Sequence, residues 1–323
     1  MNRMVSDKLT TSGGSTCPVC GDADLPTAVD LGDYRLFACR ACGCWSSDAA
    51  HRGASTSFQP AAYFEHDRAD LPRWRRLVDS LPFSEGTSPR VLDVGCGTGA
   101  FLEFIGKRFP HPELWGIELD PERAARARAR VPSATVVAAD AREGLRRLEG
   151  RFDLITLWDV FEHLPEPAAV LQQLGRLLSP EGRLYIQTIH EDSLLPRLGR
   201  LGYRLSGGRM RYAVRRTHEA HHLVFFSLRG LEILAQESRL LIERRWFDRL
   251  AWRRMDGPRV LTLAAASVLA FENWLGNGLF VNLLLRHSAR GLGALAEDEE
   301  VLSDRPLQQA VEVPAHREGD PVV

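Results

Sequence analysis

The sequence predicts an α/β fold, in which a doubly wound parallel sheet follows a small metal-binding module. Two features of the chain support this prediction. Between residues 89 and 287, short apolar segments that end in a polar residue alternate with helical patterns, an order typical of parallel strands joined by helices. Ahead of them stand two cysteine pairs with the spacing of metal ligands.

The N-terminal module contains two C-x2-C pairs that are separated by 18 residues. A glycine follows the second cysteine of each pair and lets backbone amides turn toward the sulfur. Four thiolates in two such turns form a tetrahedral structural zinc site. The first 16 residues lack the apolar segment of a secretory signal, so free thiols rather than disulfides are expected. The sequence therefore predicts a structural Zn²⁺ with the ligands Cys17, Cys20, Cys39 and Cys42, and with Cys44 as a spectator.

The strand pattern of the main domain begins at Val91 and recurs six times. The further apolar segments cover residues 114–120, 135–139, 152–158, 182–189, 240–247 and 279–285. Helical patterns lie between them, among them residues 100–108, the segment after Pro121 and residues 260–275, and a Gly-Asn-Gly turn signal follows the last of these. Strands that alternate with helices in this way predict a doubly wound sheet.

A glycine-rich run follows the first strand, Val91–Gly99, with the spacing G-x-G-x-G. Glycine is needed in such a turn because the backbone visits positive φ and a Cβ would hold a ligand away. The spacing differs from the G-x-G-x-x-G of a dinucleotide site. Asp93 lies where a carboxylate receives a ligand's ammonium or hydroxyl, and Glu118 lies where one accepts both ribose hydroxyls. The run predicts an adenosyl cofactor at the end of the first strand.

The chain resembles a class I S-adenosylmethionine-dependent methyltransferase over about residues 60–287. The resemblance is carried by the runs 91–99, 116–120, 139–140, 152–155, 159–164 and 222–227. It implies a Rossmann-like sheet that binds S-adenosyl-L-methionine. The N-terminal module is similar to the zinc knuckle of some sugar C-methyltransferases and related natural-product enzymes.

The resemblance also implies roles for individual residues at the cofactor. Residues around the methionine part would be Asp93, Gly95, Gly97 and Gly99. Glu118 would hold the ribose, Asp140 would accept from the adenine amino group, and Asp159 would line the pocket. Cys96 and Leu119 are expected beside them, with Cys96 packed in the turn rather than acting as a nucleophile. The alternative role for Asp140 and Asp159 is helix N-capping.

The expected domain organisation has five parts. Residues 1–16 and 288–323 are expected to be disordered because they carry little apolar content. Residues 17–50 form the zinc-knuckle module, residues 51–88 a linker and helical cap, and residues 89–287 the methyltransferase domain with an arginine-rich insert at 191–217. In the cap, a helical segment runs from Tyr63 to Leu81, and Tyr63 and Phe64 either line the active-site mouth or pack in the core.

Charge excludes one class of partner and suggests another. The 323 residues carry a formal net charge of −1, whereas a nucleic-acid binder usually shows a basic surplus. Between Arg197 and Arg216 there are seven arginines and no acid. Either this stretch is a solvated loop, or the repulsion among its charges is relieved by an anionic acceptor such as a nucleotide-sugar, a phosphorylated lipid or a carboxylate.

The stretch between residues 244 and 275 mixes Trp, Arg and apolar residues. Its apolar run from Val260 to Phe271 is too short for a membrane span, which needs about 20 residues. We expect a strand and an inserted helix here, and the alternative is an interfacial patch in peripheral contact with a membrane. With no transmembrane segment and with free thiols, a cytoplasmic location is expected.

Histidines and one glutamate are the candidates for acid–base work on the acceptor. His222 is the first candidate, then His190, and then Glu219. Glu219 and His222 belong to the run H-E-A-H-H, which matches no metal-ligand pattern strongly. His163 is expected to be a structural residue bonded to nearby backbone. The sequence thus predicts a small-molecule methyltransferase. The alternative is a zinc-ribbon binding module whose methyltransferase-like domain is non-catalytic or modifies RNA or protein.

Overall fold

The computed structural model describes residues 16–23, 25–48, 67–83, 86–248 and 259–293. A seven-stranded sheet forms its centre, in the order β10-β11-β8-β7-β4-β5-β6. Five of these strands are parallel to one another, while β11 runs antiparallel to both β8 and β10. The bounds are Arg90–Val94 for β4, Glu113–Glu118 for β5, Thr135–Ala138 for β6, Phe152–Trp158 for β7, Leu178–Ile189 for β8, Leu240–Asp248 for β10 and Phe280–His287 for β11.

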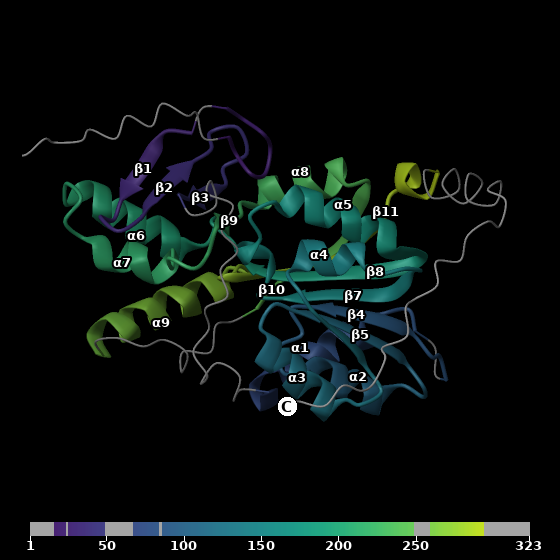
Figure 1. The fold of residues 1–323 in the computed structure, drawn as a ribbon. Coiled ribbons are helices and arrows are strands. Elements are labelled where there is room, and N and C mark those ends of the chain that lie inside the picture. The colour runs from purple at the N-terminus through teal and green to yellow at the C-terminus, as the bar shows by residue number, and fades with distance from the viewer. Residues whose placement is uncertain (1–15, 24, 49–66, 84–85, 249–258, 294–323) are drawn as a thin grey trace, which may run out of the picture.

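Helices cover both faces of this sheet, as Figure 1 shows. One face carries α1 (Asp67–Asp79), α2 (Ala100–Arg108) and α3 (Pro121–Arg130), and the other carries α4 (Ala141–Arg146), α5 (Pro167–Leu177) and α8 (Leu228–Glu237). Neighbouring residues of a strand point to opposite faces, so Val91 packs with Leu77 and Phe101 whereas Leu92 packs with Leu145 and Leu171. Apolar residues therefore cover both faces of the central strands, and a doubly wound fold is confirmed.

The strand order creates a topological switch point between β4 and β7. From β4 the chain builds outward through β5 and β6, then crosses back to place β7 on the other side of β4. The loops that leave β4 and β7 therefore turn to opposite faces, and a crevice opens at the carboxyl ends of the two strands. Ligands of open α/β sheets bind at this place.

The cysteine module contributes most of a second sheet, which has the order β1-β2-β3-β9. Its first three strands are β1 (Thr27–Asp30), β2 (Arg35–Ala38) and β3 (Trp45–Ser47), and the fourth is β9 (Val224–Phe225) from the main domain. Trp45 pairs with Phe225 and Ser46 with Val224. A strand far along the chain thus completes the sheet of the cysteine module.

The arginine-rich insert is not a solvated loop, because it folds into two helices, α6 (Leu194–Leu205) and α7 (Arg211–Thr217). In Figure 1 both lie against the cysteine module. Four of its arginines have acidic partners that lie outside the run from Arg197 to Arg216. Arg197 pairs with Asp192, Arg200 with Glu191, Arg215 with Asp33 and Arg216 with Glu219.

A buried polar network lies where the insert meets the cysteine module. Glu191 contacts Arg200 and also lies 3.1 Å from Nε2 of His218, which is fully buried. The Arg200 guanidinium lies 4.7 Å from the ring centroid of Trp45 in β3. Burial, with the nearby Arg200 charge, lowers the pKa of His218 to about 3, so Arg200 is the cation that compensates Glu191 at neutral pH.

Helix α9 (Arg259–Trp274) joins β10 to β11 and packs beside α6. Its fully buried Glu272 accepts hydrogen bonds from the backbone N of Leu194 and from the hydroxyl of Ser193, each at 2.8 Å. A carboxylate at the start of α6 complements the partial positive charge of that helix end. In the described part of the chain, no helix has the length and apolar character to cross a membrane.

Several expected boundaries move in the structure. Strand β8 begins at Leu178 instead of residue 182, because Leu178 pairs with Phe152. Disorder is expected from residue 288, but residues 289–293 are helical. The hydroxyl of Ser288 donates a hydrogen bond to the carbonyl of Arg239 and accepts one from the amide of Gly291, which stabilises the start of this helix. Much of the expected disordered ends and of the expected linker, namely residues 1–15, 294–323 and 51–66, lies outside the described residues. Tyr63 and Phe64 belong to this part of the chain.

The buried network predicts unequal costs for removing two arginines of one helix. Arg200→Leu leaves the carboxylate of Glu191 without its cation and should lower the free energy of unfolding by about 3–5 kcal/mol. Arg197→Leu removes an exposed ion pair with Asp192 and should cost about 0–1 kcal/mol. Urea unfolding of both variants measures the difference. Equal losses would contradict a compensating role for Arg200.

Candidate active site

The glycine-rich turn after β4 has the backbone geometry that only glycine adopts freely. Gly95, Gly97 and Gly99 have φ values of 76°, 55° and 81°, all in the left-handed region. A Cβ on Gly95 would lie 2.4 Å from Cγ2 of Val160, which follows β7. The two loops at the switch point therefore touch, and a side chain at Gly95 would push them apart.

Two carboxylates lie at the ends of the neighbouring strands. Asp93 is 2% exposed and its Oδ1 accepts a hydrogen bond from Oγ1 of Thr156 at 2.7 Å. Burial, aided by the charge of Glu118, raises the pKa of Asp93 to about 7. Glu118 accepts the backbone N–H of Gly97 at 2.8 Å and that of Asp120 at 3.0 Å. Glu118 thus fixes the turn after β4 from the neighbouring strand.

A pocket opens over these strand ends and runs toward α1. Its walls include Asp93, Gly95, Cys96, Gly97, Trp158, Asp159 and Gln187 from the sheet edge, and Asp70, Arg73 and Trp74 from α1. Asp159 has a φ of 52°, a conformation uncommon outside glycine and found at functional sites. The pocket thus joins the switch point to the helical cap.

Among the wall residues that the sequence did not single out are Arg73, Trp74, Trp158 and Gln187. Nη1 of Arg73 lies 3.5 Å from Oε1 of Gln187, and its Nε lies 3.9 Å from Asp248 at the end of β10. The polar Gln187, which directly follows the apolar run Leu184–Ile186, was the one signal available for this group.

The remaining expected cofactor residues occupy different environments. Cys96 packs against Gly116, where an added Cβ would lie 2.7 Å from its sulfur. Asp140 caps α4 by accepting the backbone N–H of Glu143 at 2.9 Å, as its alternative role anticipated. Asp159 does not cap the short helix η3 (Phe161–His163), whose N-cap is Val160. Leu119 is 37% exposed.

The four expected zinc ligands converge at one point of the N-terminal module. Their sulfur atoms all lie within 4.8 Å of one another, and the closest pairs, Cys17–Cys42 and Cys20–Cys39, are 3.6 and 3.5 Å apart. Sulfurs on one tetrahedral zinc are about 3.8 Å apart. Gly21 and Gly43, at φ values of 72° and 79°, close the two turns by donating to the carbonyls of the first cysteine of each pair. The donor set fits zinc.

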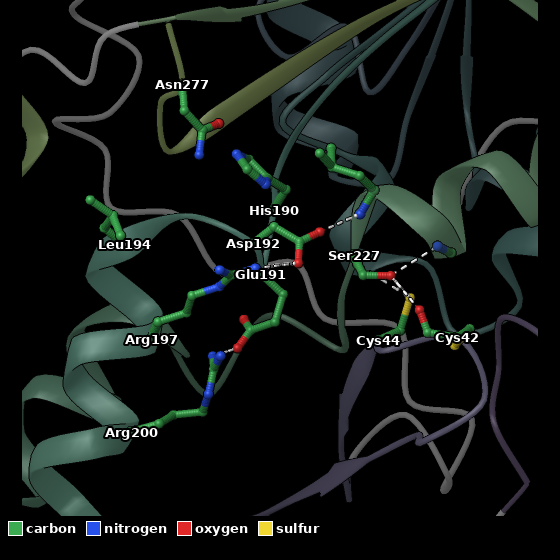
Figure 2. A network of polar contacts seen from close by, with 12 residues as sticks. Cys42, Cys44, His190, Glu191, Asp192, Leu194, Arg197, Arg200, Ser227 and Asn277 are labelled. Carbon is green, nitrogen blue, oxygen red and sulfur yellow. Dashed lines mark hydrogen bonds and ion pairs between the residues drawn. The ribbon is translucent and has the colours of Figure 1, made fainter. Parts of the chain in front are cut away.

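Cys44 ties this module to α8 instead of joining the cluster. Its sulfur accepts the backbone N–H of Ser227 at 3.3 Å. The Ser227 hydroxyl donates to the carbonyl of Cys42 at 2.5 Å and accepts the amide of Gly230 at 2.8 Å. Figure 2 shows Ser227 between the two cysteines and the start of the helix. Ser227 is thus both the N-cap of α8 and the anchor of the cysteine module.

His190 is fully buried and lies outside the pocket walls. Its Nε2 donates to the carbonyl of Gly278 at 2.5 Å, and its ring lies 5.1 Å from that of Phe247. Burial lowers the pKa of His190. Figure 2 places its side chain near Asn277, at the turn before β11. The contacts are those of a residue that secures this turn.

His222 and Glu219 also lie outside the pocket walls. His222 is 7% exposed, and burial lowers its pKa well below the ordinary value. Glu219 contacts Nε2 of His221 at 3.2 Å. His163 donates from Nδ1 to the carbonyl of His221 at 3.0 Å, which confirms its expected bond to nearby backbone. The structure gathers these histidines together, away from His190.

Glu162 is a buried acid that the sequence did not single out. It is 2% exposed, and its Oε2 accepts a hydrogen bond from Thr188 at 2.8 Å. Burial, with the charge of Asp159, raises the pKa of Glu162 to about 8. Its backbone carbonyl accepts the amide of Leu223 at 2.8 Å, so it also links the end of β7 to the segment before β9.

Comparisons with known proteins agree with this geometry. A family model described as a methyltransferase domain matches residues 64–240, more than half of the chain. The ubiquinone biosynthesis O-methyltransferase of Aeromonas salmonicida is 32% identical over 107 residues, which are 32% of this chain and 44% of that protein. The chain thus spans about half the length of the curated relatives it matches.

Two solved structures are also similar to parts of the chain. An S-adenosylmethionine-dependent methyltransferase from Mesorhizobium loti is 20% identical with a TM-score of 0.47, covering 68% of this chain and 98% of that chain. An S-adenosylmethionine-bound amino pentose methyltransferase from Micromonospora echinaspora is 31% identical with a TM-score of 0.30, covering 44% of this chain and 55% of that chain.

Proposed function

Because the chain belongs to the methyltransferase domain family, we propose that it transfers the methyl group of S-adenosyl-L-methionine to a small-molecule acceptor. One observation carries the proposal. At the switch point between β4 and β7, a left-handed glycine turn and the buried carboxylate of Asp93 line a pocket. The buried carboxylate of Glu118 supports the turn by accepting the amide of Gly97. Such a place suits a ligand with an ammonium group at one end and a ribose at the other.

In this proposal the two carboxylates bind different parts of the cofactor. Asp93 receives the ammonium of the methionine part, beside the turn of Gly95, Gly97 and Gly99. Glu118 accepts the ribose hydroxyls, since a carboxylate has about four acceptor positions and the amides of Gly97 and Asp120 occupy two. Asp140, Leu119 and Cys96 would complete the adenosine side, and Asp159 the wall opposite.

The bound cofactor would supply an electrophilic methyl group, and the chain would supply orientation and exclusion of water. Trp74 and Trp158 give the pocket apolar walls. Proton removal from the acceptor by His222, His190 or Glu219 stays a prediction, because none of them lines the pocket among the described residues. A base must come within hydrogen-bond reach of the proton it takes.

We propose that the acceptor is a small anionic molecule. The relatives named above are called O-methyltransferases of ubiquinone biosynthesis and an amino pentose methyltransferase, which favours small acceptors of the lipid-linked, sugar or natural-product kind. Three exposed arginines of the insert, Arg204, Arg209 and Arg211, have no carboxylate within 4 Å among the described residues. They are the part of the insert whose charge an acceptor would meet.

We also propose a structural Zn²⁺ on Cys17, Cys20, Cys39 and Cys42. The spacing of the four sulfurs supports it. All six cysteines of the chain are free thiols, as a zinc site in a reducing cytoplasm requires.

The raised pKa of Asp93 makes cofactor binding dependent on pH. Below about pH 7 its carboxyl binds a proton in the free protein, whereas an ammonium group needs the ionised form. Affinity for S-adenosylmethionine should therefore fall as pH decreases, by about 20-fold between pH 7.5 and pH 5.5 for one coupled proton. Isothermal titration at several pH values measures this.

Asp93→Asn is the matched variant for that titration. Its affinity should be weak and nearly independent of pH, because the amide cannot ionise. A wild-type affinity that does not change over this range would contradict the role of Asp93.

Zinc content separates the ligand cysteines from Cys44. Cys39→Ser should lose one zinc equivalent and lower the melting temperature, since the second sheet depends on the bound metal. Cys44→Ser should keep its zinc, because its sulfur contacts Ser227 instead. Elemental analysis of both proteins gives the answer, and equal zinc in the two variants would refute the assignment.

Kinetics with charged and neutral acceptors test the anionic preference. Changing Arg204, Arg209 and Arg211 together to Gln should raise KM for acceptors that carry a carboxylate or phosphate and leave that for their neutral analogues unchanged. The control changes three exposed arginines elsewhere, Arg126, Arg146 and Arg229. A KM that responds alike in both triple variants would rule out acceptor binding by the insert.

A further inference from the structure

Three histidines form a compact group apart from the cysteine cluster and the pocket. The histidine cluster comprises His163 of η3 and His221 and His222 of the segment between α7 and β9. A ring nitrogen of each lies within 4.8 Å of one from each of the others. Ring centroids are 4.4 Å apart for His221–His222 and 4.8 Å for His163–His222. Residues nearly sixty positions apart in the chain thus present three imidazoles to one point.

The contacts around two of these rings are those of metal-bound histidines. His163 donates from Nδ1 to the carbonyl of His221 at 3.0 Å, which directs its Nε2 elsewhere. His221 places Nε2 3.2 Å from the carboxylate of Glu219, which leaves Nδ1 as its second nitrogen. Metal-ligating histidines usually donate their other ring N–H to a backbone carbonyl or a carboxylate, and such contacts set the tautomer and orient the ring.

The third ring adds an observation of a different kind. His222 is 93% buried, and its Nδ1 has no hydrogen-bond partner among the described residues. An unpaired buried polar atom destabilises the fold, and buried polar groups that lack a partner are uncommon. A bound cation would compensate for burying this imidazole. The side chain of His221 is 24% exposed, so an ion can approach from solvent.

We propose that His163, His221 and His222 bind a divalent late first-row cation, Zn²⁺ being the best match for three imidazoles. Nitrogens bound to one zinc lie about 3.4 Å apart, so small ring rotations close the cluster around an ion. Glu219 is then a positioning residue that acts through His221. Three protein ligands leave a fourth position for water or another ligand, in contrast to the four-thiol site.

A cation here would connect two parts of the fold. His163 follows the end of β7 in the main sheet, while His221 and His222 lead into β9, which completes the sheet of the cysteine module. The backbone bonds from Leu223 to Glu162 and from Ser47 to Leu223, and the stacked rings of Phe161 and Phe226, lie at the same junction. The ion would hold the junction closed and raise the melting temperature as the concentration of free ion increases.

Metal stoichiometry of the full chain tests the proposal, with Zn²⁺ and Co²⁺ as probes. The wild type should bind two Zn²⁺ per chain, and His221→Ala, at a partly exposed position, should bind one. Glu219→Gln should keep both sites but bind the second ion about 10–100-fold more weakly. Co²⁺ bound by the His221→Ala protein should retain thiolate charge-transfer bands, because the cysteine site is intact.

The control is His111→Asn, a change at an exposed histidine outside the cluster, which should leave two ions bound. His222→Ala should also bind one ion, and if this buried variant fails to fold, the variants at the more exposed His221 and Glu219 decide. One equivalent in the wild type, or two in His221→Ala, would overturn the proposal. A melting temperature of the wild type that does not rise on adding the second equivalent would overturn the role at the junction.

Discussion

The contact between Gly95 and Val160 is the constraint on which the candidate site depends. The two residues follow β4 and β7, the strands on either side of the switch point. The side chain of Val160 occupies the space that a Cβ on Gly95 would need. The turn after β4 therefore takes a left-handed path and presents its backbone to the pocket. Glu118 fixes the same path from β5 through the amide of Gly97. Sheet topology, glycine and one carboxylate together shape the cradle.

The segment from His218 to Ser227 performs the second organising task. It contributes β9 to the sheet of the cysteine module, and Ser227 caps α8 while contacting Cys42 and Cys44. At its start, buried His218 shares Glu191 with Arg200 of the insert. Buried apolar contacts and a few polar contacts shielded from water, where hydrogen bonds are strongest, thus hold together the cysteine module, the insert and the main sheet.

Much of the fold was predictable because its signals are local. The glycine spacing and the apolar runs indicated the central strands, and the cysteine spacing indicated the cluster. The partners of the insert were not predictable, since Asp33 and Glu191 lie outside the arginine run that they neutralise. The same holds for the histidine cluster: His163 joins His221 only through folding, and for Arg73 no local pattern indicates a pocket wall.

The proposed binding of the cofactor rests on two ends of one ligand, with an ammonium proposed near Asp93 and a ribose proposed near Glu118. The most direct test is calorimetric titration of the full chain with S-adenosylmethionine and, separately, with adenosine. The account predicts binding of S-adenosylmethionine at one per chain and far weaker binding of adenosine, which lacks the part that Asp93 receives. Equal affinity for the two, or no binding of S-adenosylmethionine, would contradict it.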